Sequence, residues 1–348
     1  MPTIREVARL AGVSVGTVSH VISNSVPVSE ELTARVNSAI RALDYHPNHI
    51  ARSLKTSQSR TLGIIIPNIT IHFFPRVVRG AESAVWEHDY SLITLTTDDD
   101  LARQNGAISL LRSKRVDGIL LISVSGRGSI PDVRRAAESG IPVVCLDRIP
   151  PGIDVDSACT DNCAASEACV EHLIAMGHRR VAILTGLLSV KNEQQRLRGY
   201  RLALRKAGLD YDPDLVWVGS FHEEEAAQLC QERLVASTRR PTALFTTNGV
   251  VGLGALRGIY ACGLKCPDDI AFVTFDELVV DDLFEPRITT LVQPAYQIGY
   301  RGAEALIQRI QAGLSKAPPV AIRLPGELRI RESSLFRSDG GIPTFRSR

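Results

Sequence analysis

The chain contains 348 residues, 44% of them hydrophobic, and carries a formal net charge of +2. This length exceeds what one ordinary hydrophobic core accommodates, so we expect two or three domains. The sequence has no apolar run near the roughly 18 residues that span a bilayer, and no charged start followed by an apolar stretch. We therefore expect no membrane contact, no signal peptide and a cytoplasmic protein.

The charge is unevenly distributed along the chain. Residues 1–60 contain seven Lys or Arg and four acidic residues, a net of +3, whereas the remaining residues carry 33 basic and 34 acidic groups, a net of −1. Positive charge concentrated in one segment is typical of a surface that faces phosphate groups. The excess is small, so this segment alone is expected to bind a polyanion weakly.

The cysteines form an odd set in mostly apolar stretches, which indicates free, buried thiols. Two pairs are spaced like metal ligands, but no further Cys or His stands at zinc-site intervals from them. We therefore predict neither a metal site nor a cofactor. The seven residues are Cys145, Cys159, Cys163, Cys169, Cys230, Cys262 and Cys266.

An apolar helix face opens the chain. Ile4, Val7, Ala8 and Ala11 stand at i, i+3, i+4 and i+7, which is the spacing of one face of a helix. Gly12 then supplies the backbone freedom that a sharp turn requires. The pattern predicts a short first helix that ends in a tight turn.

A second short helix is predicted to follow this turn. Ser14 can cap it through its side-chain oxygen, and Val18, Val21 and Ile22 would face inward. The opposite face keeps small and polar groups that can meet base edges in a major groove, so the pair of helices predicts a helix-turn-helix. The expected DNA-contacting residues of this unit are Thr3, Ser14, Val15, Gly16, Thr17, Ser19, His20 and Asn24.

A third helix would close the core of this unit. Ser29 can cap it, and Glu30 and Glu31 suit the positive end of its dipole. The apolar stripe expected to pack on the first two helices consists of Leu32, Val36, Ala39, Ile40 and Leu43.

Five short motifs in this part of the chain resemble the LacI/GalR family of bacterial repressors. They are Ile4-Arg5-Glu6-Val7-Ala8, Ala11-Gly12-Val13-Ser14, Thr17-Val18-Ser19, Pro47-Asn48 and Ala51-Arg52-Ser53-Leu54. The likeness extends from residue 3 to about residue 335. It is especially near the purine-type members, which share His20 and residues 51–55, so the resemblance implies a purine-type operator preference.

After Thr61 the pattern changes to apolar runs that alternate with amphipathic helices. Near-continuous apolar strands separated by helices predict parallel sheets whose strands are buried on both faces. Two such series predict an α/β body of two doubly wound sheets behind the all-α three-helix head. The predicted strands are 62–66, 92–95, 118–122 and 143–146, then 181–184, 215–218, 243–245 and 270–273, with helices near 75–89, 100–114 and 129–139.

The family resemblance implies a periplasmic-binding-protein-like body of two lobes joined by three crossovers, near Asp161, residues 291–294 and Arg323. Lobes of this kind close about a hinge when a ligand binds between them. The expected parts are a helix-turn-helix domain at 1–47, a hinge helix or linker at 48–60, a first lobe at 61–160 plus 292–322, a second lobe at 161–291 plus 323–336, and a disordered tail at 337–348.

The candidate effector contacts are polar or aromatic groups just past the ends of predicted strands, where ligands bind to doubly wound sheets. Each has a structural alternative, since an aromatic side chain can be core and a strand-end Asp can cap a turn. The resemblance strengthens two of them, Arg196 and Asp276, whose motifs match positions that hold effector hydroxyls or ring nitrogens. The full set is Phe73, Phe74, Asp147, Arg148, Arg196, Phe221, Asn248 and Asp276.

Two features near these candidates have plainer structural interpretations. Residues 98–100, three consecutive aspartates, are interpreted as an acidic helix start that matches the helix dipole. His72, beside the two phenylalanines, can touch a ligand but is interpreted as structural.

These residue types suit a sugar, because carbons stack on an aromatic ring while arginine and carboxylates fix the hydroxyls. The same set can grip a purine, and Phe74, Phe221 and Arg196 align with contacts of purine-type members. An arginine of those members corresponds here to Val190, and Asn248 is followed by Gly249 where many sugar-binding members have Asp. A sugar or sugar derivative is preferred by its frequency in the family, with a purine-type effector as the alternative.

The segment from Asn48 to Lys55 is too short to be a stable helix alone, although Ala51 and Leu54 share one face. The resemblance implies that two copies fold together on DNA, that Leu54 wedges into a minor-groove step, and that Arg52 and Lys55 contact phosphate or groove edges. Lobe closure would change the distance between the two tethers and so permit or forbid this pairing.

The expected molecule is therefore a DNA-binding transcriptional regulator, most simply a repressor. Its expected partners are a pseudo-palindromic double-stranded operator, a small-molecule effector and a second copy of the chain. A dimer is favoured over a tetramer because the tail lacks leucine heptads.

Two other classes of protein fit the sequence less well. A solute-binding protein of the same bilobed shape would lack the N-terminal DNA-type segment. An enzyme on doubly wound sheets would need an assembled catalytic set, and none is evident, so no enzymatic activity is expected.

Overall fold

The computed structural model describes residues 2–23, 26–45, 58–124, 127–150, 152–278, 285–313 and 318–335. The chain divides into two compact units, Met1–Ser59 and Arg60–Arg348, which are described separately. No helix among the described residues is both long and apolar enough to cross a bilayer.

The first unit is a three-helix head made of α1 (Ile4–Ala11), α2 (Val15–Ser23) and α3 (Glu30–Ala42). Thr3 and Glu6 form a reciprocal capping box at the start of α1, and Gly12 ends that helix with φ of 63°. The Ser14 hydroxyl accepts a hydrogen bond from the Thr17 backbone N–H at 3.0 Å and so caps α2. The predicted turn at Gly12 and the predicted cap at Ser14 are therefore both present in the structure.

The core of the head joins all three helices. Val7, Val18 and Val36 are fully buried at its centre. Leu32, which was expected in the same stripe, is only half-buried. Arg35 also fixes α3 to the turn, since its guanidinium donates to the Ala11 carbonyl at 2.6 Å, a contact that the apolar pattern could not reveal.

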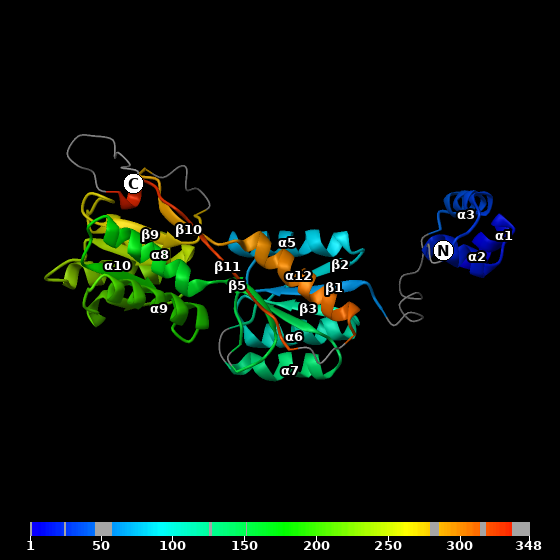
Figure 1. Ribbon diagram of the computed structural model, residues 1–348, viewed down its shortest axis with the longest axis horizontal. Helices are drawn as coiled ribbons and strands as arrows, with labels where there is room; N and C mark the ends of the chain where they lie inside the picture. Colours follow the sequence, from blue (N-terminus) through cyan, green and yellow to red (C-terminus); the bar gives the residue numbers. More distant parts are fainter. Residues whose placement is uncertain are drawn as a thin grey trace. The chain divides into compact units, whose positions relative to one another are not determined.

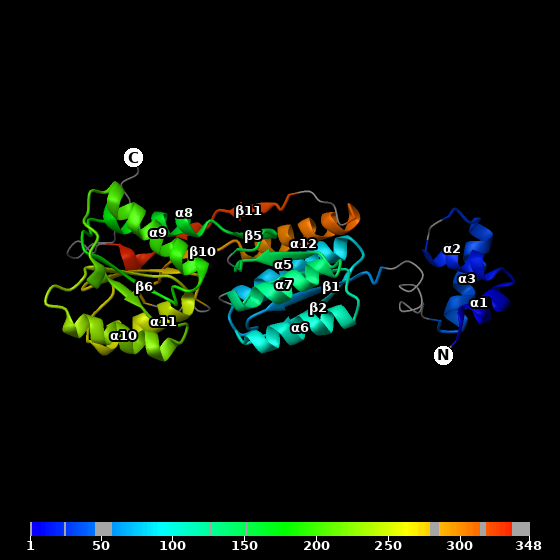
Figure 2. The same cartoon turned by 90° about the horizontal axis from the view of Figure 1, so that it is seen from below.

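The second unit contains two six-stranded sheets (Figures 1 and 2). The first sheet has the order β11-β5-β4-β3-β1-β2 and is parallel throughout. With its helices it forms the first lobe. Its elements are β1 (Thr61–Ile66), α5 (Phe73–Glu87), β2 (Ser91–Thr96), α6 (Leu101–Ser113), β3 (Gly118–Leu121), η1 (Arg127–Ser129), α7 (Ile130–Glu138), β4 (Val143–Leu146), β5 (Asp156–Thr160), α12 (Ala295–Gln311) and β11 (Ala321–Leu324).

The second sheet has the order β12-β10-β9-β8-β6-β7 and is parallel except for β12, which runs antiparallel to β10. With its helices it forms the second lobe. Its elements are α8 (Asn162–Ala175), β6 (Val181–Thr185), α9 (Lys191–Lys206), η2 (Pro213–Leu215), β7 (Val216–Val218), α10 (Glu223–Ala236), β8 (Ala243–Thr246), α11 (Gly249–Ala261), β9 (Ala271–Phe275), β10 (Thr289–Val292), β12 (Glu327–Arg329) and η4 (Glu332–Ser334).

Each sheet is covered by helices on both faces. In the first lobe α5 and α12 pack on one face and α6 and α7 on the other (Figure 1). In the second lobe α8 and α9 oppose α10 and α11. The central strands are buried as predicted, because helices remove both of their faces from water. The predicted α/β class with two doubly wound sheets is therefore confirmed.

The edge strands differ from the prediction. β2 was expected to be buried on both faces, but its residues are exposed or half-buried because only one neighbouring strand and few helices cover it. The second lobe's edge strand β7 begins at Val216 rather than residue 215, and Val218 is exposed. A continuous apolar run did not distinguish an edge position from a central one.

Three crossovers connect the lobes. The chain leaves the first sheet after Thr160, returns after Val292 and crosses again after Leu324. The last point corrects the predicted boundary, because Arg323 still pairs with Cys159 in the first sheet. The strands β5, β10, β11 and β12 were not predicted; β5, β10 and β11 lead directly into a crossover, and β12 is a three-residue edge strand that follows the last one.

The close contact between α5 and α12 depends on two glycines. A Cβ atom at Gly80 would lie 1.9 Å from the Tyr296 carbonyl oxygen, and one at Gly299 would lie 1.9 Å from that of Val77. Any larger side chain at either position would push the helices apart. These two helices therefore meet backbone to backbone.

Candidate functional site

A cleft of about 840 Å³ lies between the lobes. Its lining includes residues that follow the carboxyl ends of strands in both sheets. The structure brings all eight predicted effector residues to its walls, namely Phe73, Phe74, Asp147, Arg148, Arg196, Phe221, Asn248 and Asp276. Their contact with a ligand stays a prediction. The cleft has the size and mixed apolar and polar lining that small-molecule sites share.

Two aspartates face the cleft at equivalent points of the two sheets. Asp147 follows β4 and Asp276 follows β9, and both have left-handed backbones, with φ of 51° and 70°. The backbone N–H of Asp147 donates to the Ala158 carbonyl, and that of Asp276 donates to the Leu291 carbonyl, so both residues are still hydrogen-bonded to the neighbouring strand. The left-handed residue thus ends the strand and turns the carboxylate away from the sheet, a conformation that Asp tolerates better than most residues.

Asp147 is buried, and its carboxylate accepts a hydrogen bond from the Asn192 amide at 2.9 Å. Burial raises its pKa above the usual value, and the nearby Arg148 and Arg196 cations oppose that rise. Because Asn192 belongs to the second lobe, this hydrogen bond spans the cleft. An acceptor so poorly hydrated favours a ligand that supplies hydrogen-bond donors.

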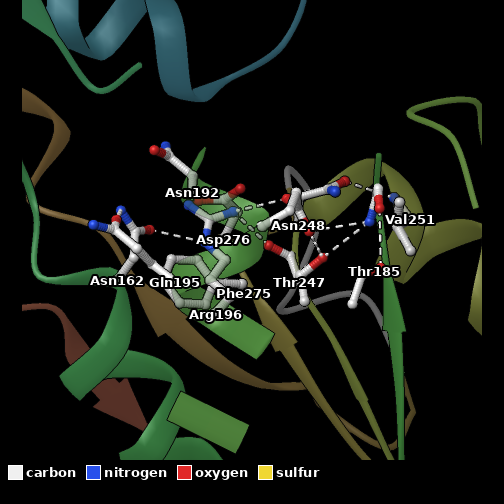
Figure 3. Close-up of polar contacts among 12 residues, drawn as sticks. Asn162, Thr185, Asn192, Gln195, Arg196, Thr247, Asn248, Val251, Phe275 and Asp276 are labelled. Carbon is white, nitrogen blue, oxygen red and sulfur yellow. Dashed lines mark hydrogen bonds and ion pairs between the residues drawn. The ribbon is translucent and has the colours of Figure 1, made fainter. Parts of the chain in front are cut away.

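The second lobe's wall is organised around Arg196, whose side chain is only 5% exposed. Its guanidinium donates to the Asn162 side-chain oxygen at 2.8 Å and to the Thr247 carbonyl at 2.6 Å, and lies 3.9 Å from the centre of the Phe275 ring (Figure 3). The Glu193 carboxylate stands 3.5 Å away, one helical turn earlier. These contacts fix the cation before any ligand arrives.

Glu193 is a buried acid beside this cation. Its carboxylate accepts from the Gly186 backbone N–H at 3.0 Å and from the Thr247 hydroxyl. Burial raises its pKa, and the Arg196 charge opposes that rise. The Glu193 carboxylate therefore holds both Gly186, which follows β6, and the Arg196 side chain.

Asp276 and Asn248 complete the second lobe's wall. Gln293 donates to Asp276 at 2.6 Å and accepts from the Thr160 hydroxyl at 2.6 Å, so this chain of bonds joins two crossover points. The Asn248 side-chain oxygen caps α11 by accepting from Val251, whereas its buried amide nitrogen has no hydrogen-bond partner among the described residues. A buried donor without a partner is costly and marks a position for a ligand acceptor.

A further ion pair links the lobes at the rim. Arg76 of α5 stands 3.2 Å from Glu277, which also pairs with Arg329 at 2.6 Å. Arg76 is 43% exposed, so the pair contributes little energy by itself. Its position across the cleft makes it sensitive to lobe opening.

The head presents the predicted DNA-contacting residues on its surface. Val15, Gly16 and His20 are exposed on α2, and Thr17 and Ser19 are half-buried beside them. The hydroxyls of Thr3 and Ser14 already serve as helix caps. The other predicted DNA contacts, Asn24, Ala51, Arg52, Leu54 and Lys55, lie outside the described residues.

Both parts of the chain match known families. Residues 3–48 match the family described as bacterial regulatory proteins, lacI family. Residues 59–328 match the family described as periplasmic binding proteins and sugar binding domain of LacI family. The chain belongs to the LacI family.

Two repressors are similar to this LacI-family chain over most of its length. The ribose operon repressor of Escherichia coli K12 is 36% identical over 310 residues, which cover 89% of this chain and 93% of that protein. The HTH-type transcriptional repressor PurR of Vibrio campbellii is 35% identical over 311 residues, with coverage of 89% and 92%. The predicted family and the role in transcription regulation are thus confirmed.

Solved structures of the family share the fold. The lac repressor dimer bound to operator and an anti-inducer has a TM-score of 0.83 at 26% identity, covering 96% of this chain and 99% of that one. The CelR–cellobiose complex has a TM-score of 0.71 at 31% identity, covering 96% and 100%. The LacI-family chain is therefore a helix-turn-helix regulator with a two-lobed effector domain.

Several residues that line the cleft or support its walls were not predicted from the sequence. Asn162, Asn192, Glu193 and Thr247 hold the predicted residues in place, and only the i, i+3 spacing of Glu193 and Arg196 signals such a role. The aspartate run was only partly understood, because Asp100 caps α6 as expected while Asp98 and Asp99 line the cleft. His72 lines it too.

The cysteines are free thiols as predicted, and most of them are buried. Burial raises the pKa of Cys145 to about 12, so it stays a neutral thiol. Within the described parts of the chain no group of three or more His, Cys, Asp or Glu could hold a metal ion.

Proposed function

We propose that this LacI-family regulator binds a sugar or sugar derivative between its lobes, and that the bound effector controls its affinity for an operator. The observation that carries the proposal is the convergence of fixed polar groups from both lobes on one cleft that also contains aromatic rings. The proposal covers the effector class, the site residues and the dimeric DNA complex.

The polar groups of the cleft suit a polyol. Asp147 and Asp276 accept hydrogen bonds and have only amide donors as described side-chain partners, Asn192 and Gln293. Arg196 and the Asn248 amide supply donors. Sugar hydroxyls both donate and accept, so they can satisfy the two kinds of group together, while sugar carbons pack on the rings.

Names of relatives support the same class. One relative regulates a ribose operon, and one structural neighbour is a complex with cellobiose. The purine alternative is favoured by the Phe74 and Phe221 rings and by the PurR relatives. Against it, position 190 is Val and cannot donate a hydrogen bond to a base.

On DNA, we propose that two heads of a dimer place α2 in successive major grooves of a pseudo-palindromic operator. A single small head gains too little affinity, and a dimer doubles the contacts and sets the half-site spacing. The tether residues Ala51, Arg52, Leu54 and Lys55 lie outside the described residues. Their proposed ordering on DNA, with Leu54 wedged into the minor groove, rests on the resemblance of residues 51–55 to the family.

The effector proposal is tested by thermal unfolding of the full-length protein against pentoses, hexoses, disaccharides and purine bases. A bound ligand raises the unfolding temperature by mass action, and we expect one sugar to do so at sub-millimolar concentration. The same sugar should change operator affinity in a gel shift and be recovered chemically unchanged. A shift with a purine base and with no sugar would contradict the proposal.

The DNA proposal is tested with Leu54→Ala. Operator binding should weaken about tenfold while binding to random DNA changes less than twofold, because a wedge contributes only where the duplex bends for it. Ser38→Ala on the exposed side of α3 is the matched control. Equal losses on both DNAs would remove the wedge from the proposal.

A further inference from the structure

The exposed side of α9 carries a row of cations. Lys191, Arg198, Arg201 and Arg205 stand at i, i+7, i+10 and i+14, and all four are exposed. With 3.6 residues per turn, they fall within about a quarter of the helix circumference and form a row about 21 Å long. The exposed Gln194 lies in the same row. We call these four cations the α9 stripe.

The charge of α9 differs from that of the chain around it. The helix contains six basic residues and one acid, Glu193, which is buried. Residues 61–348 together carry a net charge of −1. A helix this basic is therefore a local departure from the charge of the second unit.

Most cations of the α9 stripe lack an acidic partner. Lys191, Arg198 and Arg205 make no hydrogen bond or ion pair with the residues that the structure describes. Three charges on one face of the helix are therefore left to water and its ions. A polyanion can replace those ions, and their release favours its binding.

Several acids near this face are already paired. Lys206, which lies outside the stripe, stands 2.5 Å from Glu167 and 3.1 Å from Glu171 of α8. In the loop after α9, Asp212 pairs with Arg180 at 2.7 Å. These carboxylates have cations of their own, so they do not neutralise the stripe.

Both Arg201 and the helix that carries the stripe are held in place. The Arg201 guanidinium donates to the Tyr211 hydroxyl at 2.8 Å and lies 4.6 Å from the centre of that ring. A Cβ atom at Gly199 would lie 2.2 Å from the Cys163 carbonyl oxygen, so α9 rests directly on the backbone of α8. The buried Tyr200 also donates from its hydroxyl to the backbone of β6 at 2.8 Å. The stripe is therefore presented by a rigid support.

We propose that the α9 stripe binds the phosphate backbone of duplex DNA, independently of sequence and apart from the heads. One strand of the duplex presents a phosphate about every 3.4 Å of its axis, so about six phosphates pass along a row about 21 Å long. Arginine suits this partner because its guanidinium donates two parallel hydrogen bonds to a phosphate. The inference goes beyond the proposed function, which assigns operator recognition to the heads and effector binding to the cleft.

The composition of this face favours DNA over an acidic protein. Protein interfaces have an apolar centre with aromatic anchors. Among the described residues, one large exposed hydrophobic side chain contacts the stripe, that of Tyr211, and its ring is occupied by Arg201. Interfaces with DNA are more polar and more positively charged than those with protein. A row of cations without apolar neighbours therefore fits a phosphate backbone better than a folded partner.

The stripe gives the regulator a second contact with DNA. While the heads occupy one segment of duplex, α9 holds another segment of the same or a different molecule. Because the first contact keeps the DNA close, the second one forms at a high effective concentration even if it is weak by itself. A dimer can thus connect two segments of DNA without forming a tetramer.

The first test measures how salt affects the binding of full-length protein to a fluorescent random-sequence duplex of about 30 bp, by anisotropy between about 50 and 200 mM salt. The variant replaces Arg198, Arg201 and Arg205 by Gln, which has a similar helix propensity. Each lost phosphate contact reduces the slope of log K against log salt by about 0.9, so we expect a slope shallower by about 2 to 3. Affinity at the lowest salt should fall at least tenfold.

Two further variants separate the stripe from net charge and from folding. The charge control replaces three exposed arginines of α6 and α7 by Gln, and it should change the slope by less than about 1; they are Arg103, Arg134 and Arg135. Replacing the three stripe arginines by Lys keeps their charge and should keep affinity within about threefold. If the triple Gln variant does not fold, as judged by circular dichroism, Arg198→Gln alone replaces it and should reduce the slope by about 1.

The second test asks whether one protein holds two duplexes. Protein is added to beads that carry one random-sequence duplex, and retention of a second, fluorescent duplex is measured at low salt. Wild-type protein and the charge control should retain the second duplex, whereas the triple Gln variant should lose most of it.

Three results would overturn the inference. The first is a triple Gln variant that matches the charge control in slope and in retention of the second duplex. The second is a Lys variant that loses as much affinity as the Gln variant, because the role of the arginines would then not depend on charge. The third is fluorescent polyglutamate that binds wild-type protein as tightly as the duplex and loses this affinity in the triple Gln variant, which would assign the stripe to acidic proteins.

Discussion

The head and the cleft are two recognition surfaces of opposite character. The head presents exposed, mostly uncharged groups such as Val15, Gly16 and His20, which come from one short stretch of chain. The cleft presents buried charged groups such as Asp147 and Arg196, which come from distant elements of both lobes. One surface is local and hydrated, and the other is assembled and largely dehydrated.

This difference sets how each surface responds to substitution. Truncating an exposed side chain of the head removes few contacts in the free protein, so the free energy of unfolding changes little. The effect of such a substitution appears in the affinity for DNA. A buried charge in the cleft depends on partners that are themselves buried, and removing one leaves the other unsatisfied. Mutations in the cleft should therefore change stability and affinity together, whereas those in the head should change affinity alone.

The largest effect is expected from Arg196→Leu. Effector affinity should fall at least a hundredfold, and the free energy of unfolding should fall by about 3 kcal/mol because Glu193 and the Thr247 carbonyl lose a buried charged partner. Calorimetry and urea unfolding measure the two losses. Arg198→Leu, on the exposed side of the same helix, should change neither. Unchanged effector affinity with intact operator binding would contradict the placement of Arg196.

A smaller loss is expected from Asp276→Asn. The amide keeps the shape of the side chain but replaces a charged hydrogen-bond acceptor with a neutral one. Because hydrogen bonds to charged groups are stronger, effector affinity should fall about tenfold to hundredfold. The new amide oxygen can still accept the hydrogen bond that Gln293 donates, so stability should change by less than about 1 kcal/mol. A large loss of stability with normal affinity would instead make Asp276 a structural residue.

On the head, His20→Ala tests the hydrated surface. Operator affinity should fall about tenfold, as expected for one base-edge contact, while the unfolding temperature and the affinity for random DNA stay the same. Gel shifts with operator and random fragments measure the effect, with Ser38→Ala as control. A parallel loss on both fragments would indicate a phosphate contact rather than base recognition.

The smallest effect concerns acid stability. Burial lowers the pKa of His172 to about 4, and its Nε2 lies 2.7 Å from the Ser334 hydroxyl. The unfolded chain binds the proton near pH 6.5, so stability from neutral His172 is present above that pH and is lost as the pH falls toward 4. His172→Gln should flatten the fall of the urea midpoint between pH 7 and 5, and His88→Gln should not. An unchanged slope would contradict this assignment.

The same contrast explains how far the sequence could be interpreted. Capping residues, Gly12 and the apolar stripe of the head are local signals, so they predicted all three helices. The central strands were also evident from their composition. The crossover strands and the exposed edge strand β2 were not, because pairing partners and cover are decided by distant parts of the chain.

In the cleft, strand ends predicted which side chains would gather, since parallel strands end at one edge of a sheet. The residues that hold these side chains in place could not be predicted from the sequence. Asn162 meets Arg196 only after α8 and α9 pack together, and Asp99 meets Arg148 across two loops of the first lobe. Such pairs have no spacing in the sequence that would reveal them.

The backbone contact between α5 and α12 at Gly80 and Gly299 has a mechanical consequence. At this crossing the two backbones are in direct contact, so the helices can neither move closer together there nor slide past one another without a clash. This pair of helices begins at the cleft with Phe73 and at the crossover with Pro294, and α5 extends about 22 Å from there to Glu87. A displacement that a ligand imposes on Phe73 therefore has a direct route along α5 to Glu87, at the far end of the lobe.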